Sequence, residues 1–259
     1  PPGTLLLAAH SPMTIGAPVT AGGNITLLAG DTAAAGDDLI INAPVTSTGS
    51  GNIRLIAGDN LMQNANVTSN GGTIGATAET GSIVMSANAV SSSSGGTITY
   101  FAPAGNLIIA KLDAGPTGNI ELDAGGTVGP APGLDGPMLT GNAASIEAGG
   151  SVVVTAAVKA IEIDTPGRIT YTDTVSGVTI IGLSDEEQAA AAAAASNDNA
   201  TDTLLSSTEK VSETVSDDGS TGFVNTGGTK VAQNSTGDTV GGTEGTFSDE
   251  EERAKAAAK

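Results

Sequence analysis

Five acidic residues between positions 121 and 164 share one local pattern, in which acidic and hydrophobic residues alternate. Because successive side chains of a β-strand point to opposite faces, the hydrophobic residues would point inward and the acidic ones outward. Strands stacked about 5 Å apart would bring carboxylates from successive strands close together. Since Ca²⁺ takes several oxygen ligands, the pattern gives a candidate calcium site, or alternatively a solvated acidic stripe, at Glu121, Asp123, Glu147, Glu162 and Asp164.

Few other residues in the first 183 positions could do chemistry. A polysaccharide lyase or hydrolase would need paired carboxylates, or Ca²⁺ with a basic residue. The basic residues of this region are Arg54, Lys111, Lys159 and Arg168, and His10 is its single histidine. No phosphate loop, dinucleotide fingerprint or nucleophile–base pair can be assembled. We therefore expect no enzyme, no catalytic residues and no cofactor other than calcium, with a polysaccharide-degrading enzyme as the least favoured alternative.

Composition restricts both the core and the class of partner. Among 259 residues, 39% are hydrophobic, but only three Phe, two Tyr and no Trp occur, so Ile, Leu, Val and Ala must fill the core. The 37 glycines favour short strands separated by turns. A formal net charge of −19 opposes binding to nucleic acid and to anionic membranes. The sequence also lacks a hydrophobic run of membrane-spanning length, so we expect no direct membrane insertion.

Three hydrophobic positions recur along the chain before residue 183, and within residues 49–70 they are Ile53, Leu61 and Val67. The offset from the second position to the third is six residues in most repeats, whereas the step between repeats varies from 15 to 28 residues. Constant strands joined by variable turns are typical of a solenoid. We therefore predict an all-β, right-handed parallel β-helix of about eight three-strand coils over residues 1–183.

The prediction names the side chains that should stack in three inward-facing ladders. The first ladder comprises Leu5, Ile25, Ile53, Ile74, Ile98, Ile120, Ile146, Ile161 and Val178. The second comprises Met13, Leu39, Leu61, Ile83, Leu107, Val128, Val152 and Ile169. The third comprises Val19, Val45, Val67, Val90, Leu112, Leu134, Val158 and Val175.

Turn residues agree with this arrangement. Glycine pairs precede several first-ladder strands, where a corner would need the positive φ that glycine adopts at low cost. Asn24, Asn52 and Asn119 come directly before a first-ladder isoleucine, and stacked Asn side chains there would satisfy backbone groups of the corner. By alternation from Ile98, Tyr100 should point inward and Phe101 outward.

Three regions depart from the repeat. Residues 125–142 form an irregular coil, which is either a tolerated insertion or a contact loop at Pro130, Pro132, Leu134 and Pro137. The ends of the stack would expose unpaired strands for assembly at Leu5, Leu7, Val178 and Ile180. Residues 184–259 form an acidic Ala/Ser/Thr/Gly-rich tail, in which two capping boxes predict short helices near residues 185–196 and 249–259.

The repeats GGNITLLAG, DDLIINAPVTS, GNIRLIAGDNLMQNANVTS and GTITYFAPAGNLIIAK resemble those of filamentous-haemagglutinin-like large exoproteins, bacterial adhesins exported by two-partner secretion. The resemblance covers about residues 5–182. It implies a secreted or cell-surface bacterial protein that mediates attachment or assembles end to end into an extracellular fibre. Its partner would be a second copy of itself or a surface glycan or protein receptor, and a carbohydrate- or host-protein-binding module is the alternative. Because the chain begins Pro1-Pro2-Gly3, we expect a mature or excised piece of a longer protein.

Overall fold

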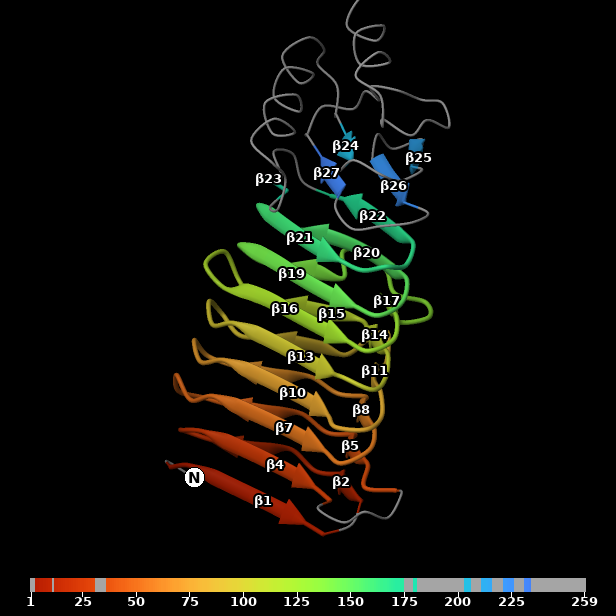
Figure 1. The fold of residues 1–259 in the computed structure, drawn as a ribbon. Helices are drawn as coiled ribbons and strands as arrows, with labels where there is room; N and C mark the ends of the chain where they lie inside the picture. Colours follow the sequence, from red (N-terminus) through yellow and green to blue (C-terminus); the bar gives the residue numbers. More distant parts are fainter. Residues whose placement is uncertain are drawn as a thin grey trace, which may run out of the picture.

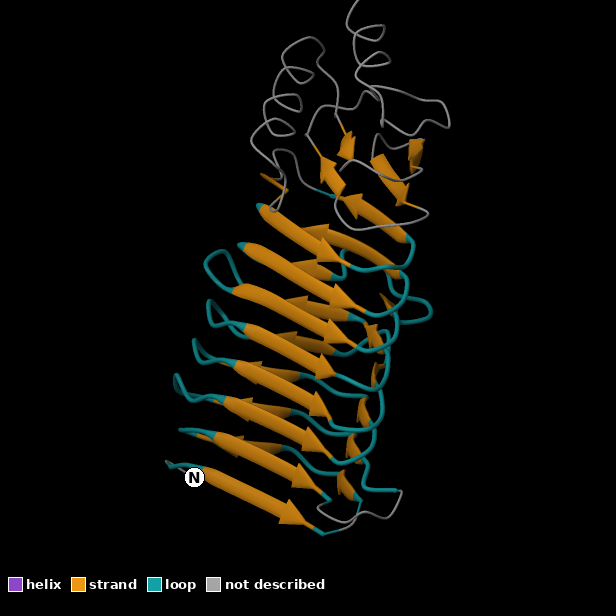
Figure 2. Cartoon of the chain, viewed as in Figure 1, coloured by secondary structure: helices purple, strands orange, loops and turns teal. Residues whose placement is uncertain are grey.

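The computed structural model describes residues 3–10, 12–30, 36–174 and 179–180, together with four strands at 203–205, 211–215, 221–225 and 231–233. All regular structure in the described residues is β-strand (Figures 1 and 2). The strands stack coil upon coil as a parallel β-solenoid, which confirms the predicted fold class. In Figure 1 the nearer strands run from left to right as the chain climbs and the return strands lie behind them, so the coil is right-handed.

One wall of the solenoid is a nine-stranded sheet, to which each coil contributes one strand. We call it the first sheet. The residues of the first ladder lie at or next to the start of each strand, and most are isoleucines, whose β-branched side chains favour extended backbone. Their order is β1 (Leu5–Ala9), β4 (Ile25–Ala29), β7 (Ile53–Ala57), β10 (Ile74–Ala78), β13 (Ile98–Ala102), β16 (Asn119–Ala124), β19 (Ala143–Ala148), β21 (Ala160–Asp164) and β23 (Thr179–Ile180).

The second and third strands of the coils form the remaining walls. The second strands are β2 (Met13–Ile15), β5 (Leu39–Ile41), β8 (Leu61–Gln63), β11 (Ile83–Met85), β14 (Leu107–Ile109), β17 (Val128–Pro130), β20 (Val152–Ala157) and β22 (Ile169–Asp173). The third strands are β3 (Val19–Ala21), β6 (Val45–Ser47), β9 (Val67–Ser69), β12 (Val90–Ser92), β15 (Lys111–Asp113) and β18 (Leu139–Thr140).

The number of three-strand coils is smaller than predicted. Val152 of β20 pairs with Val128 of β17, and Ala156 of the same strand pairs with Leu139 of β18. One strand therefore occupies both the second and third positions in that coil. As a result, six coils have three separate strands and the next two, formed by β19 with β20 and β21 with β22, have two.

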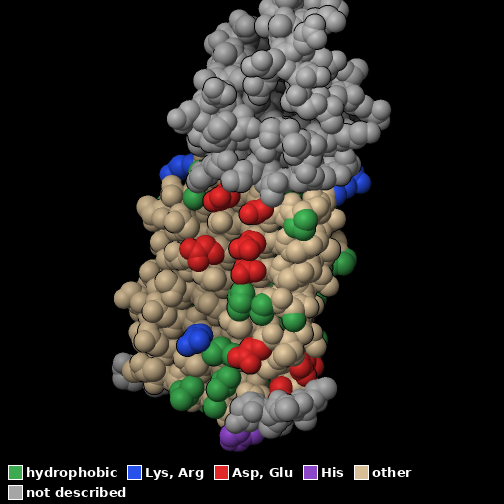
Figure 3. All heavy atoms as spheres, viewed as in Figure 1, with side chains coloured by type: hydrophobic (Ala, Val, Ile, Leu, Met, Phe, Trp, Pro, Cys, Tyr) green, Lys and Arg blue, Asp and Glu red, His purple; other side chains and the backbone are tan. Residues whose placement is uncertain are grey.

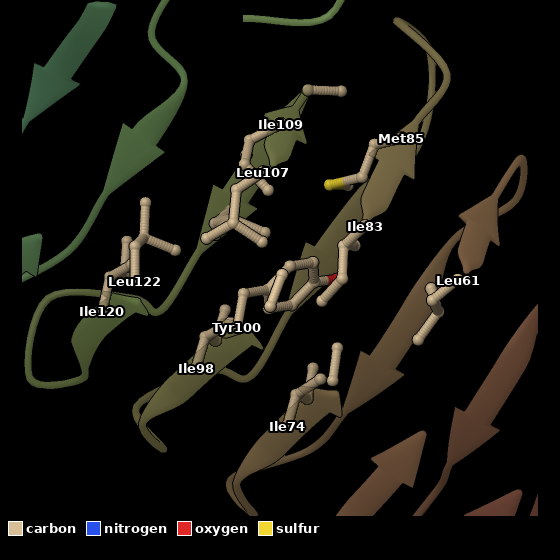
Figure 4. Packing of buried hydrophobic residues seen from close by; sticks show 14 of the residues in the cluster. Leu61, Ile74, Ile83, Met85, Ile98, Tyr100, Leu107, Ile109, Ile120 and Leu122 are labelled. Atoms are coloured by element: carbon tan, nitrogen blue, oxygen red, sulfur yellow. The ribbon is translucent and has the colours of Figure 1, made fainter. Parts of the chain in front are cut away.

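The interior is a narrow space filled by side chains from facing walls. Ile98 and Tyr100 on the first sheet point toward side chains of the second strands, and all of these are buried (Figure 4). The labelled core residues in Figure 4 are Leu61, Ile74, Ile83, Met85, Ile98, Tyr100, Leu107, Ile109, Ile120 and Leu122. The inward orientation predicted for Tyr100 is confirmed, and so is the outward orientation of Phe101, which is 37% exposed.

The second ladder is confirmed at every position from Met13 to Ile169. The first ladder is confirmed from Leu5 to Ile120, and it then differs. Ala144, not Ile146, pairs with Ile120 and carries the ladder on to Ile161. Both Ala144 and Ile146 point inward, so alternation alone cannot choose between registers that differ by two residues. The predicted last member, Val178, lies outside the described residues.

The third ladder is confirmed for Val19, Val45, Val67 and Leu112, but its member Val90 is wrong. Ser91, not Val90, pairs with Val67, because a turn in which the Ala89 amide donates to the Ser86 carbonyl oxygen lengthens the connection. Ser91 is consequently buried and Val90 is half-buried on the outer side.

Two later members of the third ladder are also wrong. Leu139, not Leu134, pairs with Leu112, because the proline-containing segment bulges out before the strand resumes. Ala156, not Val158, pairs with Leu139, because β20 reaches the third position without a turn. Val175 lies outside the described residues.

Glycine pairs at the corners serve two different purposes. Gly71 and Gly95, the first members of two pairs, have φ of 98° and 114°, as predicted. The second members are needed for close approach instead, because a Cβ at Gly72 would overlap the backbone carbonyl of Gly51 in the coil below.

Stacked Asn side chains satisfy corner amides, as predicted. The Asn24 Oδ1 atom accepts from the Asn52 backbone amide at 2.9 Å, and Asn52 Oδ1 accepts from the Thr73 amide at 2.9 Å. These two bonds fix the starts of β7 and β10, whereas Asn119 Oδ1 accepts from the Asn142 side chain at 3.1 Å and satisfies no backbone amide of the described residues there.

Strands of the tail pair with the end of the solenoid. β26 (Thr221–Asn225) lies antiparallel to β22 and also pairs with β25 (Val211–Val215). β24 (Thr203–Leu205) pairs with β27 (Val231–Gln233). The helices predicted near residues 185–196 and 249–259 lie outside the described residues.

Candidate functional site

The predicted acidic residues lie on the outer surface of the first sheet in two columns. Asp123, Glu147 and Asp164 are direct neighbours on β16, β19 and β21, and we call these three residues the acidic column. Glu121 and Glu162 belong to the adjacent column, where Ser145 separates them. The five carboxylates therefore do not form one cluster.

The acidic column has no counter-charge within the described part of the chain. None of its three carboxylates makes a hydrogen bond or ion pair there, and Glu147 and Asp164 are exposed. Glu121, in the other column, accepts a hydrogen bond of 3.1 Å from Thr99 Oγ1.

The geometry gives the calcium hypothesis little support. Among the described residues, no group of three or more His, Cys, Asp or Glu side chains lies close enough to hold a metal ion. An open row of carboxylates also differs from the converging six to eight oxygen ligands typical of a calcium site. Calcium binding at these five residues stays a prediction.

The acidic column continues toward the N-terminus as a hydrophobic one. Phe101 is the direct neighbour of Asp123, and beyond it the same register position is occupied by Thr77, Ile56 and Leu28. We call Leu28, Ile56 and Phe101 the apolar column. Figure 3 shows acidic side chains over the upper strands of this face, and hydrophobic side chains over the lower strands together with acidic and basic ones. The outward orientation of Phe101 was predicted from the sequence, but the change from hydrophobic to acidic residues along this register position was not. Alternation within β4 and β7 places Leu28 and Ile56 outward and could have indicated it.

The irregular coil projects where it was expected. Pro130 and Pro132 are exposed, whereas Leu134 and Pro137 are half-buried. The Leu134 amide donates to the Ala131 carbonyl oxygen at 3.0 Å, which closes a turn at the tip. The segment between β17 and β18 projects at the right of Figure 1. Its use as a contact loop stays a prediction.

The predicted assembly ends differ from each other. Leu7 pairs with the fully buried Leu27, yet it is 36% exposed, because no strand of the described chain lies on its other side. Leu5 is half-buried. At the opposite end Ile180 pairs with Ile161, and β22 has β26 along its outer edge. Val178 lies outside the described residues.

A buried polar network inside the core was missed from the sequence. The Tyr100 hydroxyl donates to Gln63 Oε1 at 2.5 Å and lies 2.7 Å from Ser91 Oγ, which in turn accepts from Gln63 Nε2 at 3.0 Å. Burial raises the pKa of Tyr100, and the hydrogen bond with Ser91 opposes that rise. The signal was Gln63 itself, a polar residue at the register position held by Ile41 and Met85 in neighbouring coils.

A second acidic site is structural. Asp59 accepts hydrogen bonds from Thr80 Oγ1 at 2.6 Å, from the Gly36 amide and from the Asp37 amide at 3.1 Å. These hydrogen bonds, with that of Thr80 the largest, lower the pKa of Asp59. The carboxylate therefore joins its own coil to the coils before and after it at a corner.

Comparisons with known proteins found no matching family model, no matching curated protein and no matching solved structure. The described residues include no helix long and apolar enough to span a bilayer.

Proposed function

We propose that the protein is a rigid structural or adhesive segment of a secreted or surface-attached bacterial exoprotein, and that it mediates attachment through its outer faces. The observation that carries the proposal is the unbroken first sheet, in which every strand from β1 to β21 is hydrogen-bonded to the next. The resemblance of the repeats to filamentous-haemagglutinin-like exoproteins supports it.

The solenoid is stiff, and its outer faces are large enough to contribute much of a binding interface. The interior ladders and strand-to-strand hydrogen bonds hold successive coils in one register, so the solenoid acts as a rod. The eight strands from β1 to β21 are separated by seven spacings of about 4.8 Å, so the first sheet is about 34 Å high, and five-residue strands make it about 16 Å wide. One face therefore supplies about 540 Å², a large part of the roughly 800 Å² that each partner contributes to a standard interface.

Attachment is tested by coating beads with the full chain and measuring capture on arrays of glycans and extracellular proteins. Saturable capture on one ligand class, competed by the soluble full chain, is expected. A control protein of similar size and negative charge should not be captured. Capture no greater than that of the control across both arrays would reject the attachment function.

End-to-end assembly is a second candidate, favoured by the exposure of Leu7 at an otherwise core-facing position. Light scattering over a concentration series, followed by electron microscopy, tests it. Filaments whose axial repeat is about one subunit length would support assembly, and a monomer at every concentration would reject it.

A further inference from the structure

One line of outward register positions on the first sheet changes from hydrophobic to acidic along the solenoid axis, and this change indicates a particular kind of partner. The apolar column and the acidic column occupy the same register position on consecutive strands, with Thr77 between Ile56 and Phe101. A partner lying along this line would meet hydrophobic side chains first and carboxylates afterwards.

Within the described residues, no Lys or Arg side chain pairs with the acidic column. Arg54 on β7 is three strands away from Asp123 on β16, which is about 14 Å. Lys159 is held at a corner, where its Nζ atom donates to the Pro116 carbonyl oxygen at 3.2 Å. Like charges directly opposite each other on neighbouring strands are destabilising, so the free protein carries a cost that a cationic partner would relieve.

The spacing between carboxylates of the acidic column fits a helical partner better than an extended one. Neighbouring carboxylates in the acidic column arise from strands about 4.8 Å apart. Residues on one face of an α-helix advance about 5.4 Å per turn, whereas those on one face of an extended strand advance about 6.7 Å. Three Lys or Arg on one helix face therefore follow the three carboxylates better than an extended segment does.

We propose that the outer surface of the first sheet binds an amphipathic α-helix of a partner protein, laid along the solenoid axis, with hydrophobic side chains over the apolar column and Lys or Arg over the acidic column. From Leu28 to Asp164 the line crosses six strand spacings, about 29 Å, which corresponds to a helix of about 19 residues. The inference goes beyond the proposed function and stands without it, because it concerns one partner class and not secretion or surface attachment.

The test uses fluorescent 19-residue peptides and the full chain in anisotropy titrations. One peptide carries Leu on one face in its first half and Lys on the same face in its second half, and another has that order reversed. A third has the same composition with Leu and Lys interleaved, and oligolysine serves as the extended cation. At least one segregated peptide should bind about tenfold more tightly than the interleaved peptide and oligolysine. No binding up to about 1 mM, or equal binding of all peptides, would overturn the proposal.

Matched variants locate the contact. Glu147→Gln should weaken binding about threefold, the effect of one exposed ion pair, whereas Glu79→Gln removes the same charge at an exposed corner and should have no effect. Phe101→Thr should weaken binding about fivefold. Val84→Thr is its control, because Val84 is 39% exposed on another wall and Phe101 is 37% exposed. Equal effects of a variant and its control would overturn the location.

Calcium is tested in the same series with CaCl₂ alone. The proposal predicts that about 1 mM CaCl₂ changes neither the unfolding temperature nor the site specificity of peptide binding, since the carboxylates form an open row. A rise in unfolding temperature that Glu147→Gln abolishes would instead identify a metal site and overturn the proposal.

Discussion

The inner and outer surfaces of the first sheet are made by the same strands. From coil to coil, the residue type changes little on the inner surface and much more on the outer surface. Inward positions such as Ile53 and Leu55 are hydrophobic and almost fully buried in coil after coil. One outward register position is hydrophobic at Leu28 in β4 and Ile56 in β7 and acidic at Asp123, Glu147 and Asp164 in β16, β19 and β21. Stacking therefore dictates the inner surface, whereas the outer surface is available for binding, and changes on the two sides should have different consequences.

The largest expected difference in the free energy of unfolding is between variants of two neighbouring residues in β7. Leu55→Ala leaves a cavity in the core and should lower the free energy of unfolding by about 2–5 kcal/mol. Arg54→Ala, on the outer surface, should change it by less than about 0.5 kcal/mol. Urea denaturation of the full chain measures both, and a comparable loss for the two variants would contradict the contrast.

Gly72 is closely packed against the coil below, whereas Gly75 has open space where a side chain would lie. A Cβ at Gly72 would overlap backbone of the coil below, so Gly72→Ala should destabilise by about 1–3 kcal/mol. At Gly75, on the outer surface of β10, nothing lies within 4 Å of a built Cβ. Gly75→Ala should therefore be neutral or should stabilise by about 0.5–1 kcal/mol. Destabilisation by Gly75→Ala as large as that by Gly72→Ala would contradict the claim that close approach to the coil below is what requires glycine at Gly72.

Adjacent aromatic residues of β13 test the buried polar network. Tyr100→Phe leaves Gln63 and Ser91 without one of their partners and should cost about 1–3 kcal/mol. Phe101→Tyr adds a hydroxyl on the outer surface and should cost less than about 0.5 kcal/mol. Equal costs in denaturation would mean that the network contributes nothing specific.

The stability of the wild-type protein should depend on pH through the Tyr100 phenol. The pKa of Tyr100 in the folded protein lies above its ordinary value of 10.0, so the unfolded state ionises first and stability should fall as pH rises above about 10. Tyr100→Phe should lose less stability than wild type between about pH 9 and pH 11, because it lacks this phenol. An identical pH profile for the two proteins would contradict the assignment.

The smallest destabilising effect is expected at the corner carboxylate Asp59. Because its pKa is lowered in the folded state, its contribution is present above the ordinary value of 3.8 and is lost as pH falls through the lower folded value. Asp59→Ala should therefore lower the unfolding temperature at pH 7 and have little effect near pH 2. Thermal melts at both pH values measure this, and an equal effect at the two would refute it.

The sequence predicted the fold correctly where the ladder residue itself begins each strand. The second ladder was correct throughout for this reason, even though the connection from β4 to β5 is longer than that from β7 to β8. The third ladder was wrong at Val90, Leu134 and Val158, where the preceding connection lengthens, bulges or disappears. Hydrophobic alternation fixes the face of a strand but not a shift by two residues.

The two-residue uncertainty in register also affected the prediction of the candidate site. The predicted alignment of Ile120 with Ile146 places Glu121 beside Glu147, whereas the structure places Asp123 there. Outward orientation was therefore predictable for the carboxylates, but their grouping into columns was not. The buried network also required knowledge of which coils lie side by side, since Gln63 and Tyr100 are 37 residues apart.

The most direct test of the division between inner and outer surfaces measures unfolding temperature and peptide affinity together for Glu147→Gln. Removing the central charge of the acidic column should raise the unfolding temperature of the free protein by about 1–3 °C, because like-charge repulsion is relieved. The same change should weaken binding of the segregated peptide about threefold. A lower unfolding temperature with unchanged peptide affinity would contradict the account, because it would make Glu147 a stabilising residue and not a binding one.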